Sequence, residues 1–296
     1  MQIRPLEYDY PLFRPPSEAK SLILQVTIGC SWNRCAFCEM YKNKQFSAKP
    51  LEKIYEEIIF NSRLNNSYRK VFLADGNAMV LSTEKLLKIL TCIKTYFPKR
   101  TRVSSYAIPS DILSKSYKEL ALLREHGLKQ LYIGIETGDD QILKFTNKGS
   151  SFSSILEALL KAQEAGIKLS VIILNGLGGK KYSYQHAINS ARMVNLAQPE
   201  MLSTLILSFP FGKRRFIDQF GGHYVPMEAT DLLEELEIFV ENTYLKSTIF
   251  RSDHASNYLA LKGVLSKDKQ VLLEKIRFGL HNTDHADLRA EYERGL

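Results

Sequence analysis

Apolar runs alternate with helix-like stripes along most of the chain. The run Leu22 to Ile28 is nearly all apolar and rich in β-branched residues, which is typical of a strand buried on both faces. From Lys49 to Asn61 apolar residues recur at helical spacing, and the short apolar run Lys70 to Ala74 follows. Six such strand-then-helix steps reach as far as Phe209. This order predicts parallel strands with right-handed helical crossovers, in an open sheet or a barrel.

The later steps of this array carry recognisable helix boundaries. Ser82 and Ser153 are suitable N-caps, and Gly127 and Gly166 are suitable helix ends. The remaining predicted strands are 102–106, 130–135, 168–174 and 202–209. The remaining predicted helices are 82–97, 116–125, 153–166 and 184–196.

The regular rhythm ends after Phe209. Helices are expected at 232–242 and 271–280, with a short edge strand at 248–250, and the polar stretch from His281 onward is expected to be a poorly ordered tail. We therefore predict a lead-in over 1–20, a core over 21–212 and a mostly helical extension over 213–296.

Composition indicates an ordinary globular protein. The 296 residues are 45% hydrophobic and 24% charged, and no apolar run reaches the roughly 18 residues of a membrane span. The N-terminus lacks the organisation of a signal peptide. Three of the four cysteines lie within nine residues, which favours a metal or redox site over a disulfide scaffold. We expect a cytoplasmic protein that does not associate with membranes.

The net charge of +8 permits an acidic partner. Nucleic acid, a phosphorylated small molecule and an acidic electron carrier all fit this charge. The one tight basic run, Lys213 to Arg215, is by default a solvated surface turn.

The chemistry centres on Cys30, Cys35 and Cys38, directly after the first predicted strand. Structural zinc and ordinary iron–sulfur clusters take four protein ligands, whereas three thiols leave one metal corner open for a substrate or cofactor. The alternative is a structural zinc completed by a distant histidine or by Cys92. Otherwise Cys92 is expected to be an inert buried thiol.

This loop resembles the cluster loop of the radical S-adenosylmethionine (SAM) superfamily. The resemblance implies that the three cysteines hold a [4Fe–4S] cluster and that SAM chelates its fourth iron. The aromatic Phe37 before the last cysteine fits the family pattern and is implied to lie at the cofactor. The family usually has three residues between the first two cysteines, whereas this chain has four, Ser31 to Arg34.

Later strand ends resemble further segments of the same family. The turn with Gly76 and Asn77 is similar to the family's glycine-rich turn, which receives the methionine amine of SAM. Ser104 ends a strand where family members place polar side chains against the cofactor. Asn175 and Gly176 begin a segment that is implied to approach adenine.

The segment Leu131 to Gly138, with Lys148-Gly149 after it, is similar to the Elongator-subunit, methylthiotransferase and coproporphyrinogen-oxidase-like branch. In that branch Glu136 is implied to accept hydrogen bonds from the ribose hydroxyls. The residues alone also allow Glu136 to cap the following helix.

The resemblance implies an α/β fold, a partial (β/α)6 barrel of parallel strands with the cofactor at their C-terminal ends. It implies reductive cleavage of SAM to a 5′-deoxyadenosyl radical, which abstracts hydrogen from a substrate, with a flavodoxin- or ferredoxin-type reductant. A rival hypothesis is a non-catalytic iron–sulfur or zinc protein acting as a sensor or electron carrier.

The substrate and its ligands stay open at this stage. Charge favours RNA modification, and the branch resemblance favours tetrapyrrole or other small-molecule chemistry. The candidate substrate residues lie in a polar cluster after the strand at 248–250: Arg251, Asp253, His254 and Asn257. A capped turn explains the same cluster without any function.

Overall fold

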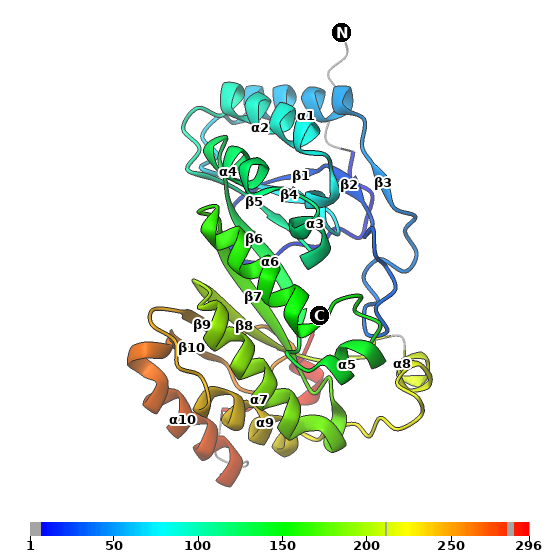
Figure 1. Cartoon of the computed structure of the whole chain (residues 1–296), viewed down its shortest axis with the longest axis vertical. Coiled ribbons are helices and arrows are strands. Elements are labelled where there is room, and N and C mark those ends of the chain that lie inside the picture. The colour runs from blue at the N-terminus through cyan, green and yellow to red at the C-terminus, as the bar shows by residue number, and fades with distance from the viewer. Residues whose placement is uncertain (1–6, 211, 283–286, 296) are drawn as a thin grey trace. The chain divides into compact units, whose positions relative to one another are not determined.

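The computed structural model describes residues 7–210, 212–282 and 287–295. Two compact units make up the chain (Figure 1). Unit 1 consists of Met1–Asn33, Cys38–Ile133 and Glu157–Leu169. Unit 2 consists of Arg34–Phe37, Gly134–Leu156 and Ser170–Leu296. The chain passes between the units several times, and the predicted division after residues 20 and 212 stays a prediction.

The strands follow the predicted alternation. Eight of them form a sheet in the order β1-β4-β5-β6-β7-β8-β9-β10, and β2 pairs with β3 alone. Their bounds are β1 Leu22–Gln25, β2 Thr27–Ile28, β3 Ser47–Ala48, β4 Lys70–Ala74, β5 Arg102–Tyr106, β6 Leu128–Glu136, β7 Lys168–Asn175, β8 Met201–Ile206, β9 Ile249–Ser252 and β10 Leu261–Val264.

The helices lie between these strands in the chain. They are α1 Leu51–Leu64, α2 Thr83–Tyr96, α3 Pro109–Leu113, α4 Tyr117–Glu125, α5 Asp140–Phe145, α6 Phe152–Glu164, α7 Gly179–Ala197, α8 Arg214–Gln219, α9 Ala229–Glu241 and α10 Leu265–His281, with 3₁₀ turns η1 Pro16–Glu18, η2 Ala78–Val80 and η3 Glu291–Glu293.

Unit 1 contains the first three parallel strands of the sheet. β4 pairs in register with β1 on one side and with β5 on the other. The apolar faces of α1 and α2 pack side by side, with Ile54, Ile58, Leu86 and Ile93 fully buried (Figure 1). Ser82 caps α2 by accepting from the Lys85 amide, as the sequence predicts. Burial of these stripes is what holds the helices to the sheet.

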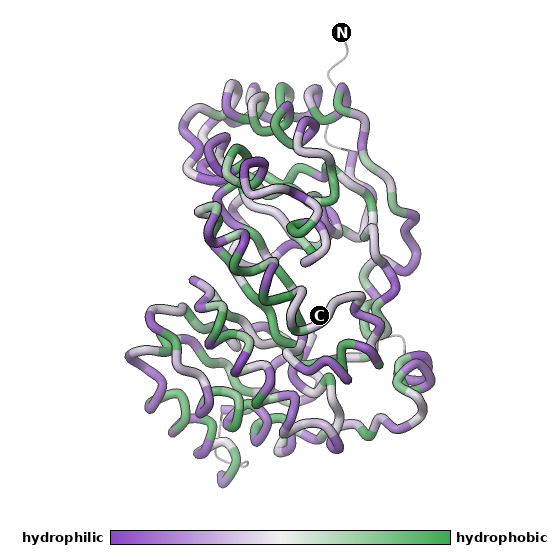
Figure 2. The backbone as a smooth tube through the Cα atoms, viewed as in Figure 1, coloured by the Kyte–Doolittle hydropathy of each residue, from purple (hydrophilic) through white to green (hydrophobic). Residues whose placement is uncertain are grey.

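Unit 2 contains parallel strands β7, β8 and β9, with β10 antiparallel at the edge. Helices α7, α9 and α10 pack beside one another in this unit. In Figure 2 the strands are mostly hydrophobic, and the helices alternate between hydrophobic and hydrophilic positions. The α/β architecture of parallel strands and crossover helices is confirmed. The extension also adds β9 and β10 to the sheet, so it is less purely helical than expected.

Several local expectations are wrong. Helix α7 begins at Gly179, five residues before the predicted start at 184, because its first turn is held by a bond from the Lys180 amide to the Val225 carbonyl. Ser153 lies inside α6 rather than at its N-cap. The basic run Lys213 to Arg215 is solvated at Lys213 and Arg214, as expected, but it leads into the short helix α8 rather than forming a turn.

The expected disordered tail is also wrong for residues 287–295, whereas residues 283–286 lie outside the described ranges. The Arg289 guanidinium donates to the carbonyls of His254 and Asn257, each at 2.8 Å. Arg294 donates to the Ser256 carbonyl at 2.8 Å and lies over the Tyr258 ring. Because arginine carries five donors, two such residues can anchor a polar segment that has little apolar surface. Among the described helices, none has the length and apolarity needed to cross a membrane.

Candidate functional site

The first part of the cysteine loop is fixed to the turn after β4, within unit 1. Asn77 Oδ1 accepts from the Ser31 backbone amide at 2.9 Å, and Asn77 Nδ2 donates to the Ser31 hydroxyl at 2.8 Å. The same nitrogen donates to Asp111 Oδ2 at 2.8 Å. The Asn77 side chain is fully buried, so its amide holds Ser31, the residue after Cys30, in one position.

Gly76 allows the same turn to lie directly against the loop. A Cβ at this position would be 2.3 Å from the Gly29 carbonyl oxygen and 2.5 Å from the Cys30 Cα. Both neighbours are backbone atoms, which cannot rotate away as a side chain would. Glycine is therefore required here by the close approach of two backbones.

A buried ion pair fixes the residues that flank this turn. Asp75 Oδ2 accepts from the Gly29 amide at 3.3 Å and lies 3.1 Å from Lys44 Nζ, with both side chains almost completely buried. Lys44 Nζ also donates to the Asp9 and Pro11 carbonyls. Because a buried charge is tolerated only when paired and hydrogen-bonded, this arrangement connects the loop firmly to the N-terminal segment.

The middle of the loop, Arg34 to Phe37, belongs to unit 2. The Ala36 amide donates to the Thr146 carbonyl at 2.8 Å, and Asn147 donates to the Arg34 carbonyl at 3.3 Å. Ala36 is buried, and Phe37 packs against an apolar cluster whose buried members are Ala36, Ile142, Leu177, Tyr182, Leu207, Phe216, Phe220 and Tyr224. The hydrogen bonds that hold Ser31 and Ala36 thus come from groups other than the thiols.

Cys30, Cys35 and Cys38 are all partly exposed, and none of the four cysteines forms a disulfide. Cys30 and Cys38 belong to unit 1, and Cys35 belongs to unit 2. In the part of the chain that the structure describes, no three His, Cys, Asp or Glu side chains are gathered closely enough to hold one metal ion.

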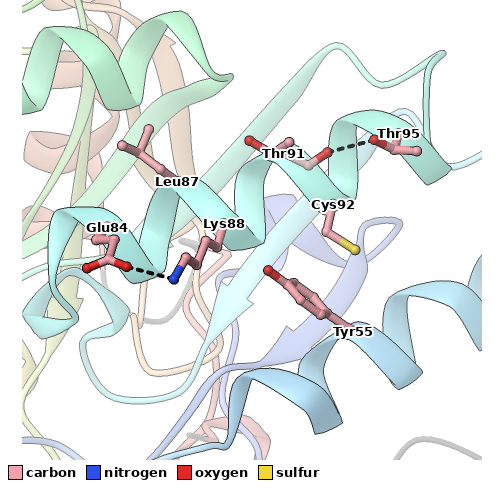
Figure 3. A pocket seen from close by; sticks show the side chains of 7 residues that line it. All are labelled: Tyr55, Glu84, Leu87, Lys88, Thr91, Cys92 and Thr95. Atoms are coloured by element: carbon pink, nitrogen blue, oxygen red, sulfur yellow. Dashed lines mark hydrogen bonds and ion pairs between the residues drawn. The ribbon is translucent and has the colours of Figure 1, made fainter.

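Cys92 lies apart from these residues, in a surface pocket of about 430 Å³ between α1 and α2 (Figure 3). Its side chain faces Tyr55, and Lys88 pairs with Glu84 on the same helix. The thiol is partly exposed, which corrects the prediction of a buried one. Desolvation nevertheless raises its pKa to about 11, so the unreactive thiol form prevails at neutral pH.

Glu136 at the end of β6 forms an ion pair with Lys148, 2.9 Å from Oε1 to Nζ, and both side chains are largely buried. Lys148 Nζ also lies 5.6 Å from the centre of the Phe37 ring. A Cβ at Gly134 would be 2.1 Å from Glu136 Oε1, so the missing side chain makes room for the carboxylate. The N-cap of α5 is Asp139, which accepts from the Ile142 amide, so Glu136 is not the helix cap.

The segment after β7 is also tightly held within unit 2. Gly176 has a positive φ of 81°, and its amide donates to Glu235 at 2.6 Å. Its carbonyl accepts from the Tyr224 hydroxyl at 2.8 Å. Asn175 is buried, and its carbonyl accepts from the Leu207 amide. Position 176 favours glycine because the backbone there is left-handed and a Cβ would lie 2.8 Å from the Leu232 side chain.

Ser104 lies in a buried polar cluster of unit 1. Its hydroxyl donates to Glu18 Oε1 at 3.1 Å, and the same carboxylate accepts from Tyr132 at 2.6 Å and pairs with Arg102 at 2.5 Å. Glu18, in η1, is fully buried. The Ser104 hydroxyl thus has its hydrogen-bond partners within the protein.

The four candidate substrate residues fall into two groups. Asp253, His254 and Asn257 belong to a turn held by Arg289, which donates to the carbonyls of all three. Asn257 is buried and donates to the Thr204 carbonyl at 2.8 Å, while burial and Arg289 lower the pKa of His254. This is the capped turn that the sequence allowed as the alternative. Arg251 lies outside this turn, on β9, and is exposed.

A comparison with known protein families identifies the array of strands and helices. The model of the radical SAM superfamily matches residues 24–194, more than half of the chain. The chain belongs to the radical SAM superfamily. Enzymes of this superfamily use a [4Fe–4S] cluster, S-adenosylmethionine and an external reductant.

Similar proteins agree with the branch expected from the sequence. The heme chaperone HemW of Bacillus subtilis is 22% identical over 182 residues, which cover 58% of this chain and 47% of HemW. The chain thus spans about half the length of this curated relative. The solved structure of coproporphyrinogen III oxidase (HemN) from Escherichia coli has a TM-score of 0.56 at 16% identity, covering 75% of this chain and 52% of HemN. Methylornithine synthase (PylB) has a TM-score of 0.53 at 17% identity, covering 76% and 63%.

The residues present fit these cofactors. Three thiols outside any disulfide are suitable sulfur ligands for iron, and the backbone around them is held by other groups. A carboxylate at a strand end, with glycine beneath it, is a suitable acceptor for sugar hydroxyls.

Sequence reasoning missed the residues that support the predicted ones. The sequence marks Lys148 only as part of the segment that follows Gly138, and it gives no sign that Asp75 pairs with Lys44. Glu18 and Glu235 had no local signal, because each is one acidic residue among many and acts on a segment far away in the chain.

Proposed function

We propose that this enzyme binds its cluster through Cys30, Cys35 and Cys38 and cleaves SAM reductively to start radical chemistry on a substrate. The observation that carries the proposal is the position of Lys148 in unit 2. Its ammonium pairs with the Glu136 carboxylate and lies over the ring of Phe37, the residue before Cys38. One cation thereby joins the candidate ribose acceptor to the cysteine loop. A sensor or electron carrier has no need of this connection.

The chain's own residues bind and orient. Asn77 and Gly76 hold the backbone at Cys30, Phe37 anchors the loop in the apolar cluster, and Glu136 offers its carboxylate to the ribose hydroxyls. A reduced cluster bound by the three cysteines would supply the one electron that reductive cleavage of SAM requires, and the cleaved cofactor would supply the hydrogen abstraction from the substrate. The protein's role is positioning and exclusion of water.

Serine variants of the three cysteines test this assignment. After anaerobic reconstitution with iron and sulfide, replacement of any one of Cys30, Cys35 and Cys38 is expected to lower 5′-deoxyadenosine formation with dithionite by more than about 100-fold, because a direct ligand matters more than an outer-shell partner. Cys92→Ser is the matched control and should keep wild-type iron content and rate. Retention of product by two of the three variants would contradict the assignment, and absence of product from the wild type would contradict the enzyme function.

For the substrate, we propose a molecule with a carboxylate or phosphate group that Arg251 binds. Arg251 on β9 is paired in register with Ser203 on β8 and with Lys262 on β10. Paired residues share a face of the sheet, with Cβ atoms about 5 Å apart. The opposite face carries Phe250 and Leu261, which are buried. Two exposed cations directly opposite each other repel, so an anion between them is favoured.

The substrate proposal is tested with a protein-free metabolite extract. In the wild type the extract should stimulate 5′-deoxyadenosine formation above the extract-free baseline. Arg251→Ala is expected to reduce this stimulation by about tenfold or more, because a hydrogen bond to a charged group contributes about 1.5 kcal/mol. Its baseline should be unchanged. Arg63→Ala, an exposed arginine on α1, is the charge-matched control. Equal stimulation of the Arg251 and Arg63 variants would exclude this role.

A further inference from the structure

A carboxylate lies completely buried at the centre of unit 2. Glu235 on α9 is 1% exposed. Its Oε1 accepts from the Gly176 amide at 2.6 Å, and its Oε2 accepts from the Ser183 hydroxyl at 2.7 Å. An apolar residue would pack α9 against its neighbours at lower cost, since burying a carboxylate requires partners for its oxygens. The groups that donate to Glu235 therefore indicate which segments the carboxylate holds in place.

A buried histidine continues the network on the other side. His186 on α7 is 1% exposed, and its Nε2 lies 3.7 Å from Glu235 Oε1 without a closer hydrogen-bond partner. Its Nδ1 lies 2.7 Å from the Thr137 hydroxyl. That hydroxyl oxygen also accepts from the Asp139 amide at 3.0 Å. At 3.7 Å, Nε2 lies beside the Glu235 carboxylate but beyond hydrogen-bond distance.

The network begins and ends beside predicted cofactor residues. Thr137 directly follows Glu136 at the end of β6. Gly176 directly follows Asn175 at the end of β7. Four side chains and one backbone amide, from the turns after β6 and β7 and from α7 and α9, thus lie in a row between the two strand ends that carry the candidate ribose and adenine contacts. Tyr224 fixes the other side of Gly176 through its carbonyl.

We propose that Glu235 and His186 are positioning residues that hold the turns after β6 and β7 in the geometry that binds the adenosine part of SAM. They do not touch the cofactor. Glu235 acts through the Gly176 amide, and His186 acts through the Thr137 hydroxyl. These hydrogen bonds restrict the backbone of the two turns. This inference rests on the proposed function, since it assumes that SAM binds at these strand ends.

The test measures SAM binding to anaerobically reconstituted protein by calorimetry, together with the change in the cluster's EPR spectrum on SAM addition. Glu235→Ala is expected to raise the Kd for SAM at least about tenfold at unchanged iron content and unchanged SAM-free spectrum. Glu235→Gln keeps an acceptor for Gly176 and a donor for Ser183, and should restore the Kd to within about threefold of the wild type. Glu234→Ala, an exposed neighbour on α9, is the matched control.

Thr137→Val keeps the proposal testable if Glu235→Ala does not fold, because it removes the other end of the network at nearly constant volume. It should also weaken SAM binding. A Kd within twofold of the wild type in every folded variant among Glu235→Ala and Thr137→Val would overturn the proposal. Failure of the wild type to bind SAM would instead overturn the proposed function, so the two failures are distinguishable.

Discussion

Gly76→Ala is expected to destabilise unit 1 by about 3 kcal/mol and to prevent normal cluster assembly. The new methyl group would be 2.3 Å from the Gly29 carbonyl oxygen and 2.5 Å from the Cys30 Cα, so either the β4 turn or the cysteine loop must move. Movement of the turn would also break the two bonds between Asn77 and Ser31. Urea unfolding followed by circular dichroism gives the stability, and iron content after reconstitution gives the effect on the site.

A matched glycine-to-alanine control is available at Gly279 in α10. A Cβ there would lie 3.5 Å from the nearest atom, a Leu233 methyl group, which is an ordinary contact. Gly279→Ala should leave stability unchanged or raise it by about 1 kcal/mol, because alanine is the better helix former. If Gly76→Ala unfolds within about 0.5 kcal/mol of the wild type and takes up normal iron, the backbone contact is not required.

Gly138→Ala is expected to cost about 3 kcal/mol in unit 2 and to weaken SAM binding as well. A Cβ at Gly138 would be 2.2 Å from the Asn189 carbonyl oxygen in α7, and the Gly138 amide donates to the Ser190 hydroxyl at 3.0 Å. The turn after β6 would have to leave α7 and carry Glu136 with it. The same unfolding and calorimetric measurements apply, with Gly279→Ala as the control. Wild-type stability and wild-type SAM affinity together would contradict this expectation.

The predictable part of this molecule is the part encoded locally. The sequence predicts the alternation of strands and helices because the hydrophobic residues of each element repeat with the period of that element. The helix cap at Ser82 is likewise predicted from a single residue. The cysteines and the glycines at strand ends were readable because their spacing is a property of one short segment. These features predicted the fold and the superfamily.

The sequence does not predict the contacts that hold the candidate site residues in place, because these contacts join segments far apart in the chain. Glu18 acts on Ser104 across 86 residues, and Glu235 acts on Gly176 across 59. A single glutamate in a Pro-rich lead-in or on a helix is by default a solvated charge. Only the assembled fold shows that these carboxylates are buried, and burial is what turns them into fixed acceptors.

Short elements with mixed composition were missed for another reason. The four residues of β10 include one lysine and one glycine, so they lack the apolar run that marked the other strands. The sequence predicts no helix before residue 184, because glycine is a poor helix former. Its Gly179 is instead required by packing, since a Cβ would be 2.6 Å from the Val225 carbonyl oxygen.

The anchoring of Arg294 to the Ser256 carbonyl has a consequence for synthesis of the protein on the ribosome. The turn at 253–258 is complete only when Arg289 and Arg294 have left the ribosome and reached its carbonyl groups. At about 5–20 residues per second, translation of the stretch from Asn257 to Arg294 takes roughly 2–7 s. The turn at 253–258 therefore acquires these two arginine partners at least this long after its own residues have been added.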